Sequence, residues 1–354
     1  MDLANVLITP SAPIHDAVAR IDRARSGALA VVDGDGRLLG VITDGDIRRA
    51  LLARVDFAQP VQTLLDRRPR ELYPEPVTAS IETTRPERLA LMRARKVRHL
   101  PILDSARRVV EFDQAEEIWD AALDVRAVIM AGGFGRRMRP LTDLIPKPLL
   151  PVGTKPVLEH LIEHLASAGV RDITIATHYR GDQIKTYCGD GASWNVAIRY
   201  VSEDTPLGTG GALKLVGASD TPLFVVNGDI LTKLDVPAMV RFHREHRADM
   251  TIGIRTLETQ VPYGVVEVEG ETVVGVLEKP IAHYFVNAGA YLVEPSVIEL
   301  VPGGSAPLDM PDLVSLLIAR GRRVVGFPVR EYWLDIGHPE QYARAQADHA
   351  DGRF

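Results

Sequence analysis

The sequence is poor in cysteine: Cys188 is the only one in 354 residues. A single thiol excludes an intramolecular disulfide and a cysteine-based zinc cluster. No apolar run reaches the length of a membrane-spanning helix, and the first ten residues, MDLANVLITP, lack the charged-then-apolar layout of a signal peptide. We therefore expect a cytoplasmic protein with no membrane contact.

An excess of positive charge is also missing. The chain has 41 Lys and Arg against 47 Asp and Glu, a formal net charge of −6. Nucleic-acid-binding domains are usually basic, so this balance argues against a DNA or RNA partner. A hydrophobic content of 46% and a charged content of 25% are typical of a globular chain, and the length predicts about two domains.

The most informative stretch is residues 126–151, RAVIMAGGFGRRMRPLTDLIPKPLLP. Its apolar start, residues 127–131, predicts a short buried strand. Glycines and basic residues follow, namely Gly132, Gly133, Gly135, Arg136, Arg137, Arg139 and Lys147. Glycines have no Cβ and let a backbone approach a ligand, while a cluster of fixed cations suits a polyphosphate. The alternative is a surface turn that is merely basic.

Two familiar phosphate loops do not fit this stretch. The Walker pattern G-x-x-x-x-G-K-[ST] is absent, and Met138 stands where the dinucleotide fingerprint needs its third glycine. The stretch instead resembles the signature G-G-x-G-x-R-x-x-P-L-T…P-K-P-L-x-P of the sugar-1-phosphate nucleotidyltransferases, which it matches almost residue for residue.

The first third of the chain contains an internal repeat. Aligning Asp33 with Asp104 brings ALAVVDGDGRLLGVITDGDI over HLPILDSARRVVEFDQAEEI, with helical patterns before and after each pair of apolar runs. This arrangement resembles a tandem pair of CBS domains (a Bateman module). We expect residues 1–124 to form the pair, as about 1–62 and 63–124, and residues 125–354 to form a second domain.

The first copy carries Gly40-Val41-Ile42-Thr43-Asp44-Gly45-Asp46, which is similar to the nucleotide-contacting pattern of CBS domains. The resemblance implies that Thr43 and Asp46 bind a regulatory nucleotide. The second copy departs from the pattern, so we expect at most one such site. Thr and Asp before a helix are also ordinary capping residues, which leaves a purely structural or dimerising module as the alternative.

From residue 126 onward strand and helix patterns alternate. Apolar runs at 172–176, 196–201 and 223–226 predict strands, and helical spacing from 157 to 165 predicts a helix. The fold class expected is therefore α/β, a Rossmann-like, mostly parallel sheet that binds ligands at the carboxyl ends of its strands. A further helix is predicted over 117–126. His160 and His164 do not match a zinc-protease motif and are interpreted as surface or interface histidines.

Five further motifs of the nucleotidyltransferase family follow in the expected order: Leu207-Gly208-Thr209-Gly210-Gly211-Ala212, Asn227-Gly228-Asp229, Glu278-Lys279-Pro280, Asn287-Ala288-Gly289 and Trp333-Leu334-Asp335-Ile336-Gly337. The reaction implied is attack of a sugar-1-phosphate oxygen on the α-phosphorus of a nucleoside triphosphate, releasing pyrophosphate.

The resemblance also implies the residue roles. Asp229 and Asp335 would hold Mg²⁺, for which carboxylate oxygens are suitable ligands. Arg137 would grip the triphosphate and Lys147 would stabilise the reacting phosphates, with Asp229 the third catalytic residue. Residues on the nucleotide would be Ala131, Gly132, Gly133, Gly135, Glu203, Gly208 and Thr209. Residues on the sugar phosphate would be Glu278, Lys279 and Asn287.

Glu203 bears on the choice of base. It stands where related uridylyl and thymidylyl enzymes commonly have a glutamine. A carboxylate only accepts hydrogen bonds, and guanine offers two adjacent donors on its Watson–Crick edge. This favours GTP. The alternative is that Glu203 is solvent-exposed at a strand end.

The combination of both domains is similar to the glucosamine-1-phosphate guanylyltransferases of bacterial legionaminic acid pathways, and CBS pairs often self-associate, so we expect a homo-oligomer. Alternatives are a thymidylyl- or uridylyltransferase on glucose-1-phosphate, a mannose-1-phosphate guanylyltransferase, and a non-catalytic nucleotide sensor.

Overall fold

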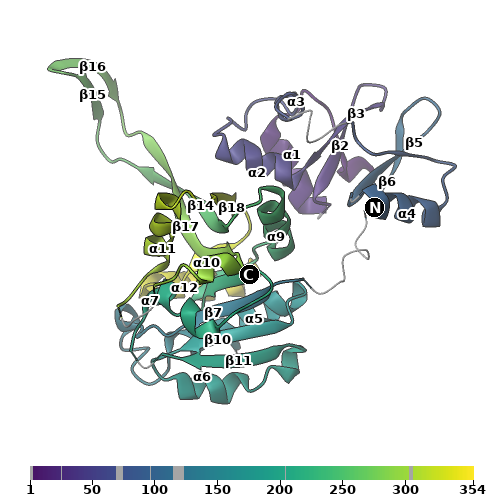
Figure 1. Ribbon diagram of the computed structural model, residues 1–354. Coiled ribbons are helices and arrows are strands. Elements are labelled where there is room, and N and C mark those ends of the chain that lie inside the picture. Colours follow the sequence, from purple (N-terminus) through teal and green to yellow (C-terminus); the bar gives the residue numbers. More distant parts are fainter. Residues whose placement is uncertain are drawn as a thin grey trace. The chain divides into compact units, whose positions relative to one another are not determined.

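The computed structural model describes residues 3–24, 26–68, 75–95, 97–114, 123–203, 205–302 and 306–354. The chain folds into two compact units, Met1–Ala121 and Ala122–Phe354 (Figure 1). Most of the helix predicted over 117–126 lies in residues 115–122, outside the described residues. Within the described ranges, no helix combines the length and apolar character needed to cross a bilayer.

The first unit contains two similar halves. The first half consists of η1 (Leu3–Asn5), β1 (Leu7–Ile8), α1 (Ile14–Ala24), β2 (Ala28–Val32), β3 (Leu38–Thr43), α2 (Asp44–Leu52) and α3 (Gln62–Asp66). The second half consists of β4 (Ala79–Ser80), α4 (Arg85–Arg95), β5 (His99–Leu103) and β6 (Val109–Gln114). Each half has a three-stranded sheet, ordered β1-β2-β3 or β4-β5-β6, with a parallel pair followed by an antiparallel pair.

The two halves of the first unit pack on each other. Arg37 and Arg108, which the repeat aligns, form an antiparallel bridge, and Val109 and Phe112 of the second half join the apolar core of the first. Helix α1 contributes Ile14, Ala17 and Ile21 to this core, a three-to-four-residue spacing that places them on one face. The repeat read from the sequence therefore corresponds to a repeated structure.

The second unit contains the remaining elements, which are β7 (Arg126–Ala131), η3 (Arg136–Met138), η4 (Lys147–Leu149), β8 (Pro151–Val152), β9 (Lys155–Pro156), α5 (Val157–Ser167), β10 (Asp172–Thr177), α6 (Gly181–Cys188), η5 (Ala192–Trp194), β11 (Ala197–Ser202), α7 (Gly208–Gly211), α8 (Leu213–Val216), β12 (Leu223–Asn227), β13 (Ile230–Thr232), α9 (Val236–Glu245), β14 (Met250–Gln260), β15 (Val265–Glu269), β16 (Thr272–Leu277), β17 (Ile281–Val293), α10 (Pro295–Ile298), α11 (Met310–Ala319), β18 (Val324–Pro328), β19 (Trp333–Asp335) and α12 (Pro339–Ala350).

A seven-stranded sheet in the order β11-β10-β7-β12-β17-β14-β18 is the centre of this unit. Strands β11, β10, β7 and β12 pair in parallel, β17 runs antiparallel to both neighbours, and β18 is parallel to β14. Strands β7 and β12 are almost wholly buried, as expected for short apolar runs covered on both faces. The predicted mostly parallel α/β fold is confirmed, with β7, β10, β11, β12 and helix α5 at the predicted positions.

An arm projects from this sheet (Figure 1). The outer parts of β14 and β17 continue as a two-stranded ribbon past Ile254, where the pairing of β14 with β18 ends. The ribbon leads into the β15–β16 hairpin. We call residues 255–286 the arm.

The interpretation of His160 and His164 as surface or interface residues is wrong. Both are partly buried on α5, where His160 Nε2 donates to the Val152 carbonyl at 3.0 Å and His164 Nε2 donates to the Leu234 carbonyl at 2.8 Å. Burial lowers the pKa of His164. These histidines tie α5 to β8 and to the segment between β13 and α9, because each ring donates to a backbone carbonyl there.

Candidate active site

The glycine turn starts where β7 ends, at buried Ala131. Gly135 has φ +62°, a left-handed conformation that favours glycine, and a Cβ there would come within 3.0 Å of Thr142. Thr142 is buried, and its hydroxyl donates to the Gly135 carbonyl at 2.8 Å. By contrast, a Cβ on Gly133 would meet no atom within 4 Å. The turn is thus packed against Thr142 at Gly135, whereas Gly133 faces open space.

Met138, which occupies the position of the third glycine in a dinucleotide fingerprint, has a packing role. Its side chain is fully buried and packs in a cluster with Leu150 and Val152. Arg137, next to it, is exposed. The short helix η3 therefore uses one residue as an anchor and presents the adjacent guanidinium to solvent.

Lys147 lies in η4, directly after Pro146, whose backbone is extended. Only 13% of its side chain is exposed, and its ammonium group forms an ion pair with the Asp229 carboxylate. Asp229 belongs to the Asn227-Gly228-Asp229 segment after β12, where the Gly228 N–H donates to the Met130 carbonyl of β7 at 2.8 Å. The lysine of the signature and the aspartate of a distant motif thus meet at one edge of the sheet.

Asp335 completes this group. Strands β13 and β19 pair antiparallel with Ile230 opposite Asp335, and the Ile336 N–H donates to the Asp229 carbonyl at 3.1 Å. The pKa of the Asp335 carboxyl is raised above its ordinary value, first by partial desolvation and then by the negative charge of Asp229. Lys147, Arg137 and His338 act on the pKa in the opposite direction. The side chains expected to surround the triphosphate are therefore electrostatically coupled.

The donor set fits Mg²⁺. Asp229 and Asp335 offer hard carboxylate oxygens, and the raised pKa of Asp335 comes first from its partial desolvation and then from the negative charge of Asp229. No group of three or more His, Cys, Asp or Glu side chains suited to a metal occurs in the part of the chain that the structure describes. A metal held by two protein carboxylates would take its other ligands from phosphates and water, as Mg²⁺ commonly does.

Glu203 lies beside the glycine turn. One carboxylate oxygen, Oε2, accepts a hydrogen bond from the Leu207 N–H at 2.7 Å. The other, Oε1, is 2.9 Å from where a Cβ on Gly132 would stand, so the carboxylate packs against the glycine turn. His178 Nδ1 donates to the Glu203 carbonyl at 2.7 Å, and the Phe134 ring meets the His178 ring edge-on at 5.3 Å. Glu203 is thus fixed next to the turn at both its main chain and its carboxylate.

The second glycine-rich segment, α7, packs against the start of α11. A Cβ on Gly208 would come within 2.6 Å of the Leu308 carbonyl oxygen, and the N–H groups of Gly210 and Gly211 donate to that same oxygen. The Thr209 hydroxyl accepts from the Met310 N–H at 3.0 Å. Packing against α11 accounts for these glycines, and a nucleotide-binding role of Gly208 and Thr209 stays a prediction.

The three residues expected at the sugar phosphate are not brought together. Asn287 lies where the arm leaves the sheet, and its side chain contacts the Tyr291 hydroxyl at 2.6 Å and the Gly289 N–H at 2.9 Å. Glu278 and Lys279 are exposed and lie on the arm, beyond Ile281. Strand β17 spans roughly 20 Å between Ile281 and Asn287 at about 3.3 Å per residue. Glu278 and Lys279 are thus well separated from Asn287.

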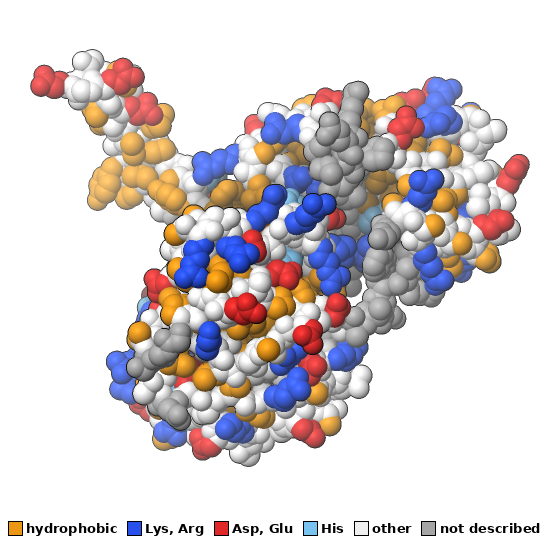
Figure 2. All heavy atoms as spheres, in the orientation of Figure 1, with side chains coloured by type: hydrophobic (Ala, Val, Ile, Leu, Met, Phe, Trp, Pro, Cys, Tyr) orange, Lys and Arg blue, Asp and Glu red, His pale blue; other side chains and the backbone are white. Residues whose placement is uncertain are grey.

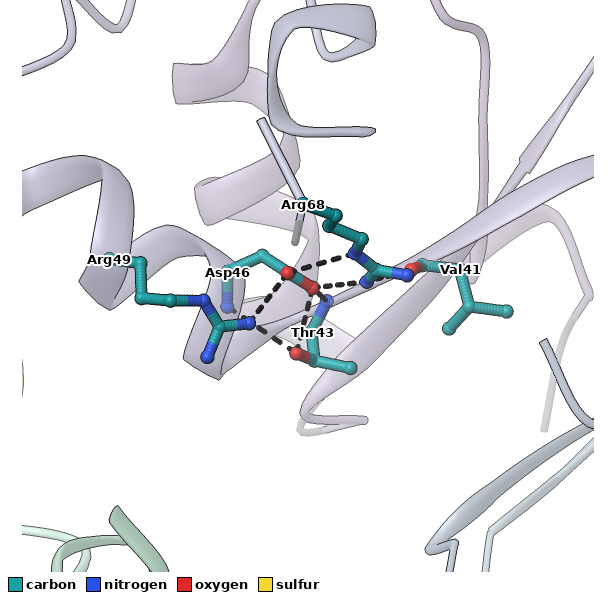
Figure 3. Close-up of polar contacts among 5 residues, drawn as sticks. All are labelled: Val41, Thr43, Asp46, Arg49 and Arg68. Atoms are coloured by element: carbon teal, nitrogen blue, oxygen red, sulfur yellow. Dashed lines mark hydrogen bonds and ion pairs between the residues drawn. The ribbon is translucent and has the colours of Figure 1, made fainter. Parts of the chain in front are cut away.

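In the first unit, Thr43 and Asp46 form a capping box at the start of α2 (Figure 3). The buried Asp46 carboxylate accepts hydrogen bonds from the Thr43 N–H (2.8 Å), the Thr43 hydroxyl (2.9 Å), Arg49 (2.7 Å) and Arg68 (3.0 Å from Nε). Burial alone would raise its pKa, but Arg68, Arg49 and Thr43 hold it below the ordinary value. A nucleotide at Asp46 would have to displace Arg68.

Sequence reasoning missed several residues that build the site. Thr142 was part of the quoted signature, but its role was not predicted: its buried hydroxyl donates to the Gly135 carbonyl and so stabilises the glycine turn. Asn227 packs against Gly289, where an added Cβ would lie 2.7 Å from Asn227 Nδ2, and the Trp333 indole donates to the Ala288 carbonyl at 2.7 Å. The sequence showed the order of the motifs that contain Asn227, Gly289 and Trp333, but it did not predict that these motifs contact one another.

With this geometry established, comparisons with known proteins define the class. Residues 126–352, well over half of the chain, match the family model described as nucleotidyl transferase, and the chain belongs to this family. Residues 2–53 match the CBS domain model. The predicted recognition of a nucleotidyltransferase domain preceded by a CBS domain is confirmed.

Individual relatives agree with this class. The chain is 36% identical over 236 residues to a mannose-1-phosphate guanylyltransferase of Mycobacterium tuberculosis, covering 64% of this chain and 65% of that protein. It is 34% identical to a mannose-1-phosphate guanyltransferase of Yarrowia lipolytica, covering 62% of each. The chain therefore spans a little under two thirds of these relatives. A solved structure of HddC from Yersinia pseudotuberculosis is 27% identical, with a TM-score of 0.50, and the match covers 64% of this chain and 99% of that one.

Proposed function

We propose that the protein transfers a nucleotidyl group, GMP from GTP, to a sugar-1-phosphate and releases pyrophosphate. The observation that carries this proposal is the meeting of Lys147, Asp229 and Asp335 at the sheet edge where the glycine turn begins. A purely nucleotide-sensing protein would have no need for two metal-type carboxylates next to a buried lysine. The family match supports the same reaction class.

The reaction needs little covalent help from the protein. A sugar-1-phosphate oxygen is already anionic at neutral pH, so no side chain has to remove a proton from it. The oxygen attacks the α-phosphorus, a new phosphorus–oxygen bond forms, and the bond to the bridging oxygen of the β-phosphate breaks, with its electron pair leaving on pyrophosphate. What the protein supplies is alignment and neutralisation of charge.

Three groups of this chain would provide that neutralisation. The open backbone at Gly133 would approach the triphosphate, and the exposed Arg137 would bind its outer phosphates. Lys147, held in place by Asp229 and by its proline-flanked turn, would stabilise the charge that develops around the α-phosphorus. Asp229 and Asp335 would hold Mg²⁺, which when bound neutralises phosphate charge and orients the triphosphate.

The proposal of GTP rests on Glu203. Its carboxylate lies beside the glycine turn, where a base would follow the phosphates, and it offers acceptors only. The guanylyltransferase names of the two relatives favour the same base. A thymidylyl or uridylyl specificity is the alternative.

Two sugars remain candidates. The relatives' names favour mannose-1-phosphate, whereas the combination with a CBS pair favours glucosamine-1-phosphate. A homo-oligomer and a regulatory nucleotide at Thr43 and Asp46 are part of the same proposal. Calorimetric titration of the full-length Lys147→Ala variant with adenine and guanine nucleotides tests the regulatory site. If no heat appears beyond that of binding at the active site, the proposal of a regulatory nucleotide is wrong.

The decisive experiment is a matrix of four nucleoside triphosphates against mannose-, glucosamine- and glucose-1-phosphate, each with Mg²⁺ and with pyrophosphate release as the readout. GTP with one of the first two sugars should give the highest kcat/KM. A higher value with UTP or dTTP would overturn the choice of base, and no release in any of the twelve mixtures would overturn the enzyme proposal itself.

A further inference from the structure

The arm concentrates the exposed apolar surface of the molecule. Of the twenty large hydrophobic side chains exposed among the described residues, eleven lie between residues 255 and 286. Figure 2 shows apolar side chains along the projecting arm and acidic side chains at its tip. Scattered exposed apolar residues are ordinary, but a contiguous group of this kind marks an interaction surface.

These side chains are ordered by the strand register. In the β15–β16 hairpin Val266 pairs with Val276 and Val268 with Val273, so that all four valines lie on one face. They are 53%, 62%, 61% and 59% exposed, in that order. The other face is mixed, since it carries the Glu267–Gly275 and Glu269–Thr272 pairs together with the apolar Val265–Leu277 pair. We call the first of these the valine face.

A two-stranded hairpin with an uncovered apolar face is marginally stable in water, so this register is difficult to explain without a partner. A standard interface buries roughly 800 Å² on each partner. A contact of that size would take in the valine face together with other exposed side chains of the arm, such as Leu257, Tyr263 and Ile281.

Charge restricts the nature of that partner. Along the arm the five carboxylates of Glu258, Glu267, Glu269, Glu271 and Glu278 outnumber the two fixed cations, Arg255 and Lys279. This excess of negative charge disfavours nucleic acid and an anionic membrane surface. The valine face itself carries no charge, and its members form two cross-strand pairs on either side of a β-bulge between Glu267 and Val268. Two such faces can pack on each other as facing sheets do, with the glutamates left on the outer sides in water.

We propose that the arm is a homotypic docking element: the valine face packs against the valine face of a second copy of this chain about a two-fold axis. Such a contact is isologous, because the same patch is used on both subunits, and it closes at two copies. The hydrophobic effect drives it, since each hairpin removes four half-exposed valines and their neighbours from water.

Cysteine cross-linking on the full-length protein tests the contact directly. The only native cysteine, Cys188, is buried, and burial raises its pKa to about 12, so it does not compete. Val266→Cys, Val268→Cys, Val273→Cys and Val276→Cys are treated one at a time with a short bis-maleimide. Ile318→Cys, which replaces a 62% exposed residue of α11, is the matched control. At least one arm variant should give a covalent dimer at low micromolar concentration while the control stays monomeric on a denaturing gel.

The proposal is overturned if all four arm variants, with melting temperatures equal to wild type, cross-link no better than Ile318→Cys. Sedimentation velocity gives a second, independent result. Introducing Val266→Glu and Val276→Glu together removes the arm contact, so the wild-type assembly should sediment with twice the mass of the variant. An unchanged mass would equally overturn the proposal.

Discussion

Asp229 and Asp335 are brought together by a single backbone arrangement: β13 and β19 pair antiparallel, and the Ile336 N–H donates to the Asp229 carbonyl. Desolvation raises the pKa of Asp335 and the negative charge of Asp229 raises it further, although Lys147 and Arg137 oppose that shift. A pair of like charges kept close in this way is stabilised by a cation. The predictions below follow from this arrangement and from the residues around it.

Replacing Lys147 by alanine should reduce kcat by about 10²- to 10³-fold, the range expected when one preorganised group that stabilises transition-state charge is removed. The fold should persist, as judged by circular dichroism. Lys155→Ala is the matched control, since Lys155 forms a more exposed ion pair with Glu163 on the same unit. Wild-type pyrophosphate release by Lys147→Ala would show that the proposed role is wrong.

Asp335→Asn should separate stability from activity. Because the pKa of Asp335 is raised in the folded protein, its ionised form destabilises the folded state, fully at pH values above the folded pKa and not at all below the unfolded value of about 3.9. Asp335→Asn should therefore melt at a higher temperature than wild type at pH 7 without metal, and the difference should shrink as the pH falls toward 4.

The same variant should lose turnover and the increase in melting temperature that Mg²⁺ with GTP gives to wild type. Asp220→Asn, at an exposed position, provides the control. A lower melting temperature for Asp335→Asn than for wild type at pH 7 would contradict the electrostatic argument.

Glu203→Gln should shift the choice of base. An amide can still accept the hydrogen bond from the Leu207 N–H through its oxygen, so the loop should be retained. The variant would present a donor to guanine, and discrimination by a matched polar pair is typically about 1–3 kcal/mol. The ratio of kcat/KM for GTP over UTP should fall by about 5- to 150-fold, which is what 1–3 kcal/mol corresponds to. Glu245→Gln, at an exposed helix end, should leave the ratio unchanged, and an unchanged ratio in Glu203→Gln would remove this residue from base selection.

Asp46→Asn should destabilise the first unit. Its carboxylate is buried and accepts from both Arg49 and Arg68, and breaking a buried charged pair typically costs about 3–5 kcal/mol. Asp35→Asn removes an exposed partner of Arg37 and should cost less than about 1 kcal/mol. Urea denaturation followed by far-ultraviolet circular dichroism measures both. Equal midpoints for the two variants would mean that the Asp46 network contributes little.

Much of the second unit could be predicted from the sequence because its signals are local. The apolar run before Gly132 became β7, the spacing from 157 to 165 became α5, and the motifs at Asp229 and Asp335 fell at strand ends. The meeting of those two aspartates depends on the pairing of β13 with β19, two three-residue strands about a hundred residues apart. Strands that short carry no periodic signal, so only the family resemblance suggested the pair.

Other features depended on contacts that no pattern reveals. The glycines from 208 to 211 suited a ligand, yet the approaching group is the backbone of Leu308. Glu278 and Lys279 lie just beyond the far end of β17, which continues from the sheet into the arm. Their distance from Asn287 therefore depends on how far this strand extends beyond the sheet. His160 donates to the Val152 carbonyl of β8, eight residues away, and His164 donates to the Leu234 carbonyl, 70 residues away. Apart from that of His160, the deciding partners lie far away in the sequence.

The most direct measurement is a crystal structure of the protein with a non-hydrolysable GTP analogue and Mg²⁺. The metal should lie between the carboxylates of Asp229 and Asp335, with the triphosphate along Gly132–Arg137 and the α-phosphate next to Lys147. A triphosphate bound elsewhere, or a metal that contacts neither aspartate, would contradict the proposed site.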